Sequence, residues 1–212
     1  MYKIAVLVSG GGTNLQAIID RIADGTIPDT KISLVVSKRR SAYALERAAS
    51  AGIPTSVIHP KKFETPALFG EALTRVIAES GAQLVVLAGC LMTIPPELIR
   101  AYPDRIINIH PSLIPSFCGK GYYGLTVHEK ALERGVKVTG ATVHIVDERL
   151  DHGPILLQKA VEVLPEDTPE TLQLRVMQQA EWVLLPQAVR AFAQGRVTVK
   201  DGQAQICPEE AE

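Results

Sequence analysis

The chain has few cysteines, and their placement excludes two kinds of structure. Only Cys90, Cys118 and Cys207 occur in 212 residues, and no two of them stand in C-x-x-C spacing. An odd number of widely separated cysteines argues against both a disulfide framework and a structural zinc site. We therefore expect reduced thiols.

Long hydrophobic runs and an excess of one charge are also missing. The first apolar run, Ile4 to Val8, is shorter than the roughly 7 to 15 residues of a signal-peptide core, and no run approaches the ~20 residues that span a bilayer. Lys and Arg number 22 against 23 Asp and Glu, giving a formal net charge of −1. This balance disfavours a general polyanion-binding surface. We expect a cytoplasmic protein with neither nucleic-acid nor membrane partners.

With 46% hydrophobic and 21% charged residues, the composition is typical of a globular protein. Strand-like runs alternate with helix-like ones in the first half, which implies a mostly parallel sheet covered by helices. We expect strands over 3–9, 31–37, 55–59, 83–88 and 105–110, and helices over 14–23, 42–51, 67–80 and 96–101.

The second half has a different pattern. We expect a helix over 127–134, an antiparallel strand pair over 137–146 and 155–163, a helix from 168 to about 194, a short hairpin over 196–206, and an acidic tail, 208–212. The predicted fold class is α/β, a mostly parallel Rossmann-like open sheet with helices on both faces and an antiparallel strand pair in the C-terminal part. No linker or internal repeat interrupts the chain, so we predict a single domain over 1–212.

A glycine-rich segment, Ser9-Gly10-Gly11-Gly12-Thr13-Asn14, lies between the first expected strand and helix. Backbone N–H groups and the helix dipole make this position an anion site, and phosphate is the natural ligand. A dinucleotide fingerprint would have Gly or Ala at Leu15 and an acidic residue near Ser37-Lys38-Arg39-Arg40, and a P-loop would have Lys after Gly12. Two alternatives stay open: a purely structural turn, and an NADP-dependent reductase that rests on the basic cluster alone.

The segment Ile106-Ile107-Asn108-Ile109-His110-Pro111-Ser112 ends a strand with an amide and an imidazole on one face. Asn108 and His110 share that face because side chains alternate along a strand. Pro111 ends the strand, at the sheet edge where open α/β folds bind ligands. A carboxamide that can donate to an oxyanion, beside a group that titrates near neutral pH, suits acyl transfer. The alternative is that both side chains satisfy loop backbone groups.

Three segments together resemble the phosphoribosylglycinamide formyltransferase family. They are Ser9-Gly10-Gly11-Gly12-Thr13-Asn14-Leu15-Gln16, Asn108-Ile109-His110-Pro111-Ser112-Leu113-Ile114-Pro115 and Leu150-Asp151-His152-Gly153-Pro154-Ile155. The resemblance implies transfer of the formyl group of 10-formyltetrahydrofolate, a co-substrate, to the amine of glycinamide ribonucleotide in purine synthesis. It also implies an N-terminal phosphate-binding part, about 1–100, and a C-terminal catalytic and folate-binding part, about 101–207.

On that resemblance, Asn108 would hold the formyl oxygen, His110 would handle protons and Asp151 would orient or charge the imidazole. The amine would attack directly, through a tetrahedral intermediate that carries an oxyanion. A carboxylate near His110 would raise its pKa, so we expect a raised pKa for this histidine.

The same resemblance places three residues of the glycine loop, Gly12, Thr13 and Asn14, on the substrate phosphate and Glu181 on the substrate amine. The folate would be held by Leu91, Met92, Thr93, Ile94, Asn108, Val146 and Asp147. Two positions depart from the family pattern, because Met92 and Pro66 stand where arginines are frequent.

The remaining histidines suggest no metal. His110, His128, His144 and His152, taken with Asp151, lack the His-x-x-x-His spacing of a helical site, so we expect no metal. We expect His128 on the surface and His144 partly buried, hydrogen-bonded and close to Asp151. The Gly-containing loop over 117–124 is expected to close over substrate.

Other functions remain as alternatives. A formyltetrahydrofolate deformylase would use water in place of the amine, a methionyl-tRNA formyltransferase would need a nucleic-acid surface, and a regulatory module would keep only the nucleotide loop. We expect the glycinamide ribonucleotide enzyme because the two related enzymes usually carry an additional domain, and we expect a monomer or homodimer.

Overall fold

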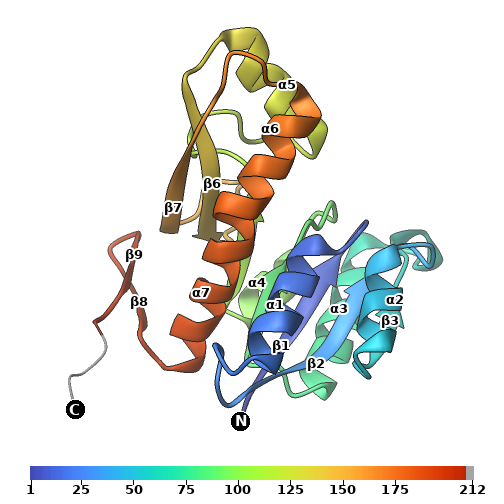
Figure 1. Cartoon of the computed structure of the whole chain (residues 1–212). Helices are drawn as coiled ribbons and strands as arrows, with labels where there is room; N and C mark the ends of the chain where they lie inside the picture. The colour runs from blue at the N-terminus through green and yellow to red at the C-terminus, as the bar shows by residue number, and fades with distance from the viewer. Residues whose placement is uncertain (209–212) are drawn as a thin grey trace. The chain divides into compact units, whose positions relative to one another are not determined.

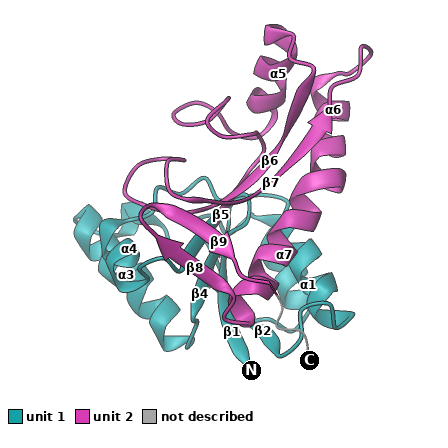
Figure 2. Ribbon diagram, turned by 90° about the vertical axis from the view of Figure 1, so that its left-hand side faces the viewer, with its two compact units in different colours: residues 1–107 teal, residues 108–212 magenta. Residues whose placement is uncertain are grey.

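The computed structural model describes residues 1–208, and it divides the chain into two compact units, 1–107 and 108–212 (Figure 2). Of the predicted acidic tail, residues 209–212 lie outside the described part. The single-domain prediction stays a prediction, and each unit is described by itself.

Unit 1 is built on parallel strands in the order β3-β2-β1-β4-β5, and the last of these strands crosses the unit boundary. The strands are β1 (Tyr2–Val8), β2 (Thr30–Ser37), β3 (Thr55–Val57), β4 (Leu84–Leu87) and β5 (Ile106–His110). The central strands are apolar throughout because both of their faces are covered: residues 4–8 of β1 are fully buried.

The helices of unit 1 alternate with its strands along the chain. They are α1 (Thr13–Ala23), α2 (Tyr43–Ser50), a 3-10 turn η1 (Pro60–Lys62), α3 (Pro66–Glu79) and α4 (Pro96–Ala101). Figure 2 shows α3 and α4 on one side of the unit 1 strands and α1 on the other. The predicted α/β class with helices on both faces is confirmed.

Unit 2 continues from the end of β5 through α5 (Leu125–Arg134) to an antiparallel pair, β6 (Val138–Ile145) and β7 (Ile155–Glu162). The strand order here is β5-β6-β7, and the register of β6 against β7 shifts between Val143 and His144. A separate hairpin follows at the end, β8 (Val197–Lys200) with β9 (Gln203–Ile206). The predicted C-terminal antiparallel pair is therefore present.

The long C-terminal helix differs from its prediction in one respect. Instead of one α-helix to about 194, the structure has α6 (Pro169–Val176), a π-helical turn η2 (Met177–Glu181) and α7 (Trp182–Ala193), a succession that can be followed in Figure 1. A π-turn accommodates one residue more than an α-helical turn, because its hydrogen bonds span i to i+5.

The other expected elements match the observed ones to within one or two residues at each end. The 3-10 turn η1 was not predicted, and three-residue turns of this kind give no periodic signal. Among residues 1–208, no helix combines the length and the apolar content that a bilayer crossing requires.

Candidate active site

The predicted catalytic residues come together within unit 2. Asn108 and His110 lie at the end of β5, His144 lies near the end of β6, and Asp151 lies between β6 and β7. His110 is 5% exposed and His144 is 2% exposed, so both imidazoles are removed from bulk water.

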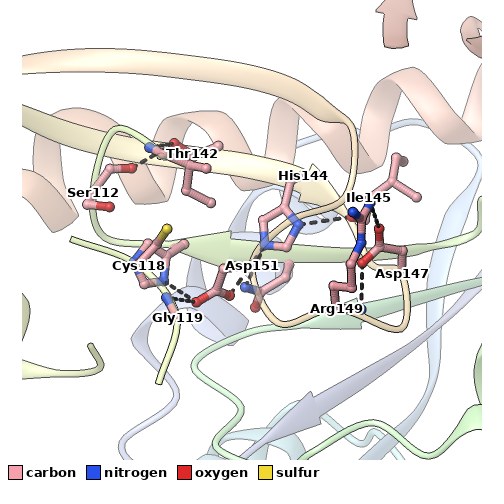
Figure 3. Close-up of polar contacts among 12 residues, drawn as sticks. Ser112, Cys118, Gly119, Thr142, His144, Ile145, Asp147, Arg149 and Asp151 are labelled. Atoms are coloured by element: carbon pink, nitrogen blue, oxygen red, sulfur yellow. Dashed lines mark hydrogen bonds and ion pairs between the residues drawn. The ribbon is translucent and has the colours of Figure 1, made fainter. Parts of the chain in front are cut away.

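Asp151 contacts both histidines at once. Its Oδ2 lies 3.7 Å from His110 Nδ1 and its Oδ1 lies 3.7 Å from His144 Nε2. The backbone N–H of Gly119 donates to Asp151 Oδ2 at 2.9 Å, as Figure 3 shows. The carboxylate is therefore held between two imidazoles and one main-chain donor.

Backbone carbonyls assign the tautomers of the two histidines, because a carbonyl oxygen can only accept. His110 Nε2 lies 2.9 Å from the Phe117 carbonyl, so Nε2 carries hydrogen and Nδ1 of the neutral ring is free to accept a proton. His144 Nδ1 lies 2.9 Å from the Ile145 carbonyl, so Nδ1 carries hydrogen there.

The His144 tautomer in turn fixes the orientation of Asn108. The amide nitrogen of Asn108 can only donate, so His144 Nε2 accepts the hydrogen bond from Asn108 Nδ2 at 3.1 Å. An amide nitrogen has two N–H groups. One is used on His144, and the second remains as a donor for substrate.

The local backbone explains how Asp151 reaches this position. Asp151 has φ of 52°, a left-handed conformation that aspartate tolerates better than most residues. A side chain at position 153 would overlap the Ile145 carbonyl oxygen at the end of β6, so Gly153 is required where the chain passes that strand. The Asp-x-Gly pattern is therefore a tight turn that aims the carboxylate back at the end of β6.

The expectation of a raised pKa for His110 is wrong. Burial lowers the pKa of His110 below its usual value, and this outweighs the opposite influence of the Phe117 carbonyl and the Asp151 carboxylate. For Asp151, burial alone would raise the pKa, but hydrogen bonding, including that from the Gly119 N–H, favours the ionised form and holds the pKa below its usual value. The resting pair is thus a neutral imidazole beside a carboxylate.

The expectation that His128 lies on the surface is also wrong. His128, in α5, is fully buried, and neither ring nitrogen has a hydrogen-bond partner among the described residues. Burial, with a smaller effect of His110, lowers the pKa of His128 to about 4. The position early in an amphipathic helix was ambiguous in the sequence, because it could fall on either face.

The glycine loop lies in unit 1 as predicted. Gly12 precedes α1 with φ of 74°, and a side chain there would overlap Ala44. The Gly10 carbonyl accepts from the Ala44 N–H at 3.1 Å, and the Gly11 carbonyl accepts from Arg47 Nε at 2.8 Å. In a trans peptide the N–H points opposite to the carbonyl, so the N–H groups of Gly11 and Gly12 face away from α2. This is the arrangement of an anion-binding loop.

The predicted folate segment, Leu91 to Ile94, follows β4 in unit 1. Ser9 Oγ accepts from the Leu91 N–H at 2.8 Å, and Lys38 Nζ donates to the Leu91 carbonyl at 2.9 Å. Leu91 is therefore held on both sides of its backbone. Because Lys38 is engaged here, the basic cluster offers less to the 2′-phosphate of a dinucleotide than the sequence suggested.

The remaining predicted residues lie in unit 2. Val146 and Asp147 follow β6, and Asp147 Oδ2 pairs with Arg149 Nη2 at 3.2 Å. Glu181 ends the π-turn and is 5% exposed. Gly12, Thr13, Asn14 and the segment 91–94 belong to unit 1.

Two main-chain groups in the site were not predicted, the Phe117 carbonyl and the Gly119 N–H. Main-chain contacts leave no residue-type signature, although the glycines of the 117–124 loop indicated an unusual backbone. Within residues 1–208, no group of three or more His, Cys, Asp or Glu side chains is arranged to hold a metal ion.

The chain is similar in sequence and in fold to known proteins. Residues 2–189 match the formyl transferase family. A phosphoribosylglycinamide formyltransferase from Haemophilus influenzae is 39% identical over 206 residues, covering 97% of this chain and 94% of the relative. The crystal structure of glycinamide ribonucleotide transformylase 1 from Symbiobacterium toebii has a TM-score of 0.92 at 42% identity, covering 98% of this chain and 95% of that one.

A related enzyme of different activity has the same fold. A formyltetrahydrofolate deformylase from Pseudomonas syringae pv. tomato has a TM-score of 0.85 at 29% identity, covering 98% of this chain and 66% of that one. The match over most of the chain, together with the cluster of Asn108, His110 and Asp151, leads to one conclusion: the chain belongs to the formyl transferase family.

Proposed function

We propose that this protein is a phosphoribosylglycinamide formyltransferase, which transfers the formyl group of 10-formyltetrahydrofolate to the amine of glycinamide ribonucleotide. One observation carries the proposal: Asn108, His110 and Asp151, linked through His144, form a single cluster that can move a proton and stabilise an oxyanion. Relatives that carry this name align over nearly the whole chain.

Proton transfer is the task of His110. As the substrate amine attacks the formyl carbon, it must lose a proton, and the departing folate nitrogen must gain one. Nδ1 of neutral His110 accepts the first proton and returns it to the leaving nitrogen. Burial keeps His110 neutral near pH 7, so it starts the reaction as a base.

Asp151 stabilises the charge that His110 then carries. Its carboxylate, 3.7 Å from Nδ1, is too far for a direct hydrogen bond but close enough to attract the imidazolium. The gap leaves room for small movements or an ordered water in the proton path. No covalent intermediate with the protein is needed.

Asn108 stabilises the oxyanion of the tetrahedral intermediate. Its second Nδ2–H is the donor, because the first is held by His144. A preorganised donor of this kind contributes about 3 kcal/mol to transition-state stabilisation.

The binding roles follow the family pattern. Gly12, Thr13 and Asn14 take the ribonucleotide phosphate, through the N–H groups of the loop and the start of α1. Leu91 to Ile94, Asn108, Val146 and Asp147 hold the folate, and Glu181 contacts the substrate amine. The partners are small molecules, with neither nucleic acid nor membrane among them, and the protein works in the cytoplasm as a monomer or homodimer without a metal.

The first prediction separates transfer from hydrolysis. The purified protein is incubated with 10-formyltetrahydrofolate, with and without glycinamide ribonucleotide, and tetrahydrofolate release is followed. We expect release only with the amine, and a loss of at least about 100-fold in His110→Ala, since general acid–base catalysis contributes this much.

The alternative outcome has a definite meaning. The deformylase that shares the fold makes hydrolysis the second candidate. Release at the same rate without the amine would identify a deformylase and overturn the proposed transfer.

A further inference from the structure

One short turn, residues 117–119, contacts both His110 and Asp151 through its main chain. It is called the 117–119 turn below. The Phe117 carbonyl accepts from His110 Nε2 at 2.9 Å, and the Gly119 N–H donates to Asp151 Oδ2, also at 2.9 Å. The turn therefore supplies an acceptor to the base and a donor to the carboxylate.

The backbone of this turn adopts a conformation that its surroundings must impose. Phe117 has φ of 49°, which costs roughly 1–2 kcal/mol for a residue with a side chain, and Gly119 has φ of 84°. Such a conformation persists only where neighbouring contacts hold it. The contacts to His110 and Asp151 are two of those contacts.

Tyr122 provides two more. Its backbone N–H donates to the Gly119 carbonyl at 3.1 Å, and its ring lies 6.2 Å from the Phe117 ring, centroid to centroid, in a tilted arrangement. The ring pair joins the two ends of the segment 117–122. Tyr123, the next residue, is 56% exposed and makes no comparable ring contact among the described residues.

We propose that the 117–119 turn positions two side chains for the proposed reaction. It fixes His110 in its Nε2–H tautomer and holds Asp151 beside His110 Nδ1. The ring of Tyr122 keeps the turn in place. This inference rests on the proposed function for its kinetic consequence. Its structural part, the tautomer, stands on the two main-chain contacts.

The physical reason is the number of states available to a neutral imidazole. Without the Phe117 carbonyl, either ring nitrogen of His110 can carry the hydrogen, and only one of the two tautomers leaves Nδ1 free as a base. Without the Gly119 N–H, the carboxylate of Asp151 loses a donor that favours its ionised form. Both losses weaken the base without removing any side chain that touches substrate.

The proposed role of the turn predicts a direction for the change in the pH dependence of kcat. The titratable groups that face His110 are Asp151, His144 and His128, from the β6–β7 connection, β6 and α5. The Phe117 carbonyl is one of the influences that raise the pKa of His110 against burial. Loss of the Phe117 contact while the His110 ring stays buried should lower the pKa of His110 further, so the acid limb of the kcat profile moves to lower pH.

The experiment compares Tyr122→Ala with Tyr122→Phe, which keeps the ring contact with Phe117. We expect Tyr122→Ala to lower kcat about tenfold with KM for both substrates within about twofold, and to shift the acid limb to lower pH. The phenylalanine variant should behave as the parent protein does.

Long-range ¹H–¹⁵N NMR measures the tautomer of the His110 ring without an activity assay. The His110 signals are assigned by their loss in His110→Ala. We expect the Nε2–H form in the parent protein and a mixture in Tyr122→Ala. An Nδ1–H form in the parent protein, or an unchanged kcat and tautomer in Tyr122→Ala, would overturn the inference. If Tyr122→Ala does not fold, the parent spectrum still decides the tautomer. If formyl transfer itself is absent, the spectrum tests the turn separately from the proposed function.

Discussion

The carboxylate of Asp151 lies next to the imidazoles of both His110 and His144. The two imidazoles differ in which ring nitrogen carries the hydrogen. His110 gives its Nε2–H to a carbonyl and keeps Nδ1 basic, whereas His144 gives its Nδ1–H to a carbonyl and accepts from Asn108. Identical side chains thus acquire different tasks from the backbone groups beside them. His110 is set up as a base, and His144 as a support for the amide.

The charge of Asp151 is testable with an isosteric change. Asp151→Asn keeps the shape of the side chain but removes the attraction to the His110 imidazolium, so we expect kcat to fall about 100-fold or more. Steady-state kinetics at neutral pH measure the change. Asp29→Asn is the matched control, because Asp29 is exposed and has φ of 50°, close to the 52° of Asp151. Full activity in Asp151→Asn would contradict the proposed role.

Helix α6 begins with several polar interactions that together fix its direction. Thr168 and Thr171 form a reciprocal capping box, and Pro169 occupies the first turn. Arg175 makes a bidentate pair with Asp167, whose side chain is 1% exposed. Asp167 also accepts from the Leu164 N–H at 2.8 Å, which ties the helix start to the chain that follows β7.

The Asp167–Arg175 pair should contribute measurably to stability. Hydrogen bonds from Arg175 come first among the causes that hold the pKa of Asp167 at about 2. Against an ordinary value of 3.8, this corresponds to about 2 kcal/mol. Because Leu164 and Thr171 also lower this pKa, we expect Arg175→Met to lower the free energy of unfolding at pH 7 by at most about 2 kcal/mol, measured by urea denaturation.

The pH dependence of that loss follows from linkage. The folded-state pKa is depressed, so the stabilisation is present above pH 3.8 and is lost as pH falls through about 2. The gap between Arg175→Met and the parent should therefore narrow below pH 3. Lys130→Met removes an exposed helical pair with Glu133 and should leave stability near that of the parent. An equal loss in both variants would contradict the special role of the buried pair.

The π-turn between α6 and α7 shows how a helix absorbs a local change in length. Helical periodicity predicted one continuous segment, and the three pieces do follow one another without a break. The pattern could not place the π-turn, because a shift of hydrogen bonding from i+4 to i+5 changes the phase of the following helix without changing residue types. Glu181, at the end of this turn, is 5% exposed.

The buried histidine of α5 makes the acid stability of the protein depend on one residue. The pKa of His128 is depressed to about 4 from an ordinary 6.5, because the folded interior disfavours the charged ring. The unfolded chain therefore binds a proton that the folded chain does not, between pH 6.5 and about 4. Stability is highest above pH 6.5 and falls by about 3 kcal/mol as pH drops to 4.

His128→Leu removes this acid sensitivity. We expect its urea midpoint to change less between pH 7 and pH 4.5 than that of the parent protein, because the buried imidazole of His128 is no longer there to be charged. His152→Leu, at an exposed histidine, is the control and should keep the parent dependence. An identical slope in all three proteins would show that His128 does not carry the effect.

Local patterns in the sequence were enough for the α/β class and for nearly all element boundaries, and they put Asn108 and His110 on one strand, whereas Asp151 was implied by the family resemblance. The spacing of apolar residues indicates which positions are buried, and glycines indicate where the backbone has an unusual conformation. The Asn-x-His spacing indicates that Asn108 and His110 share one face of a strand. Tertiary structure was needed for properties that depend on distant neighbours. The depressed pKa of His110, the burial of His128 and the tautomers of both active-site histidines arise from desolvation and from main-chain groups, and neither leaves a mark in the residues themselves.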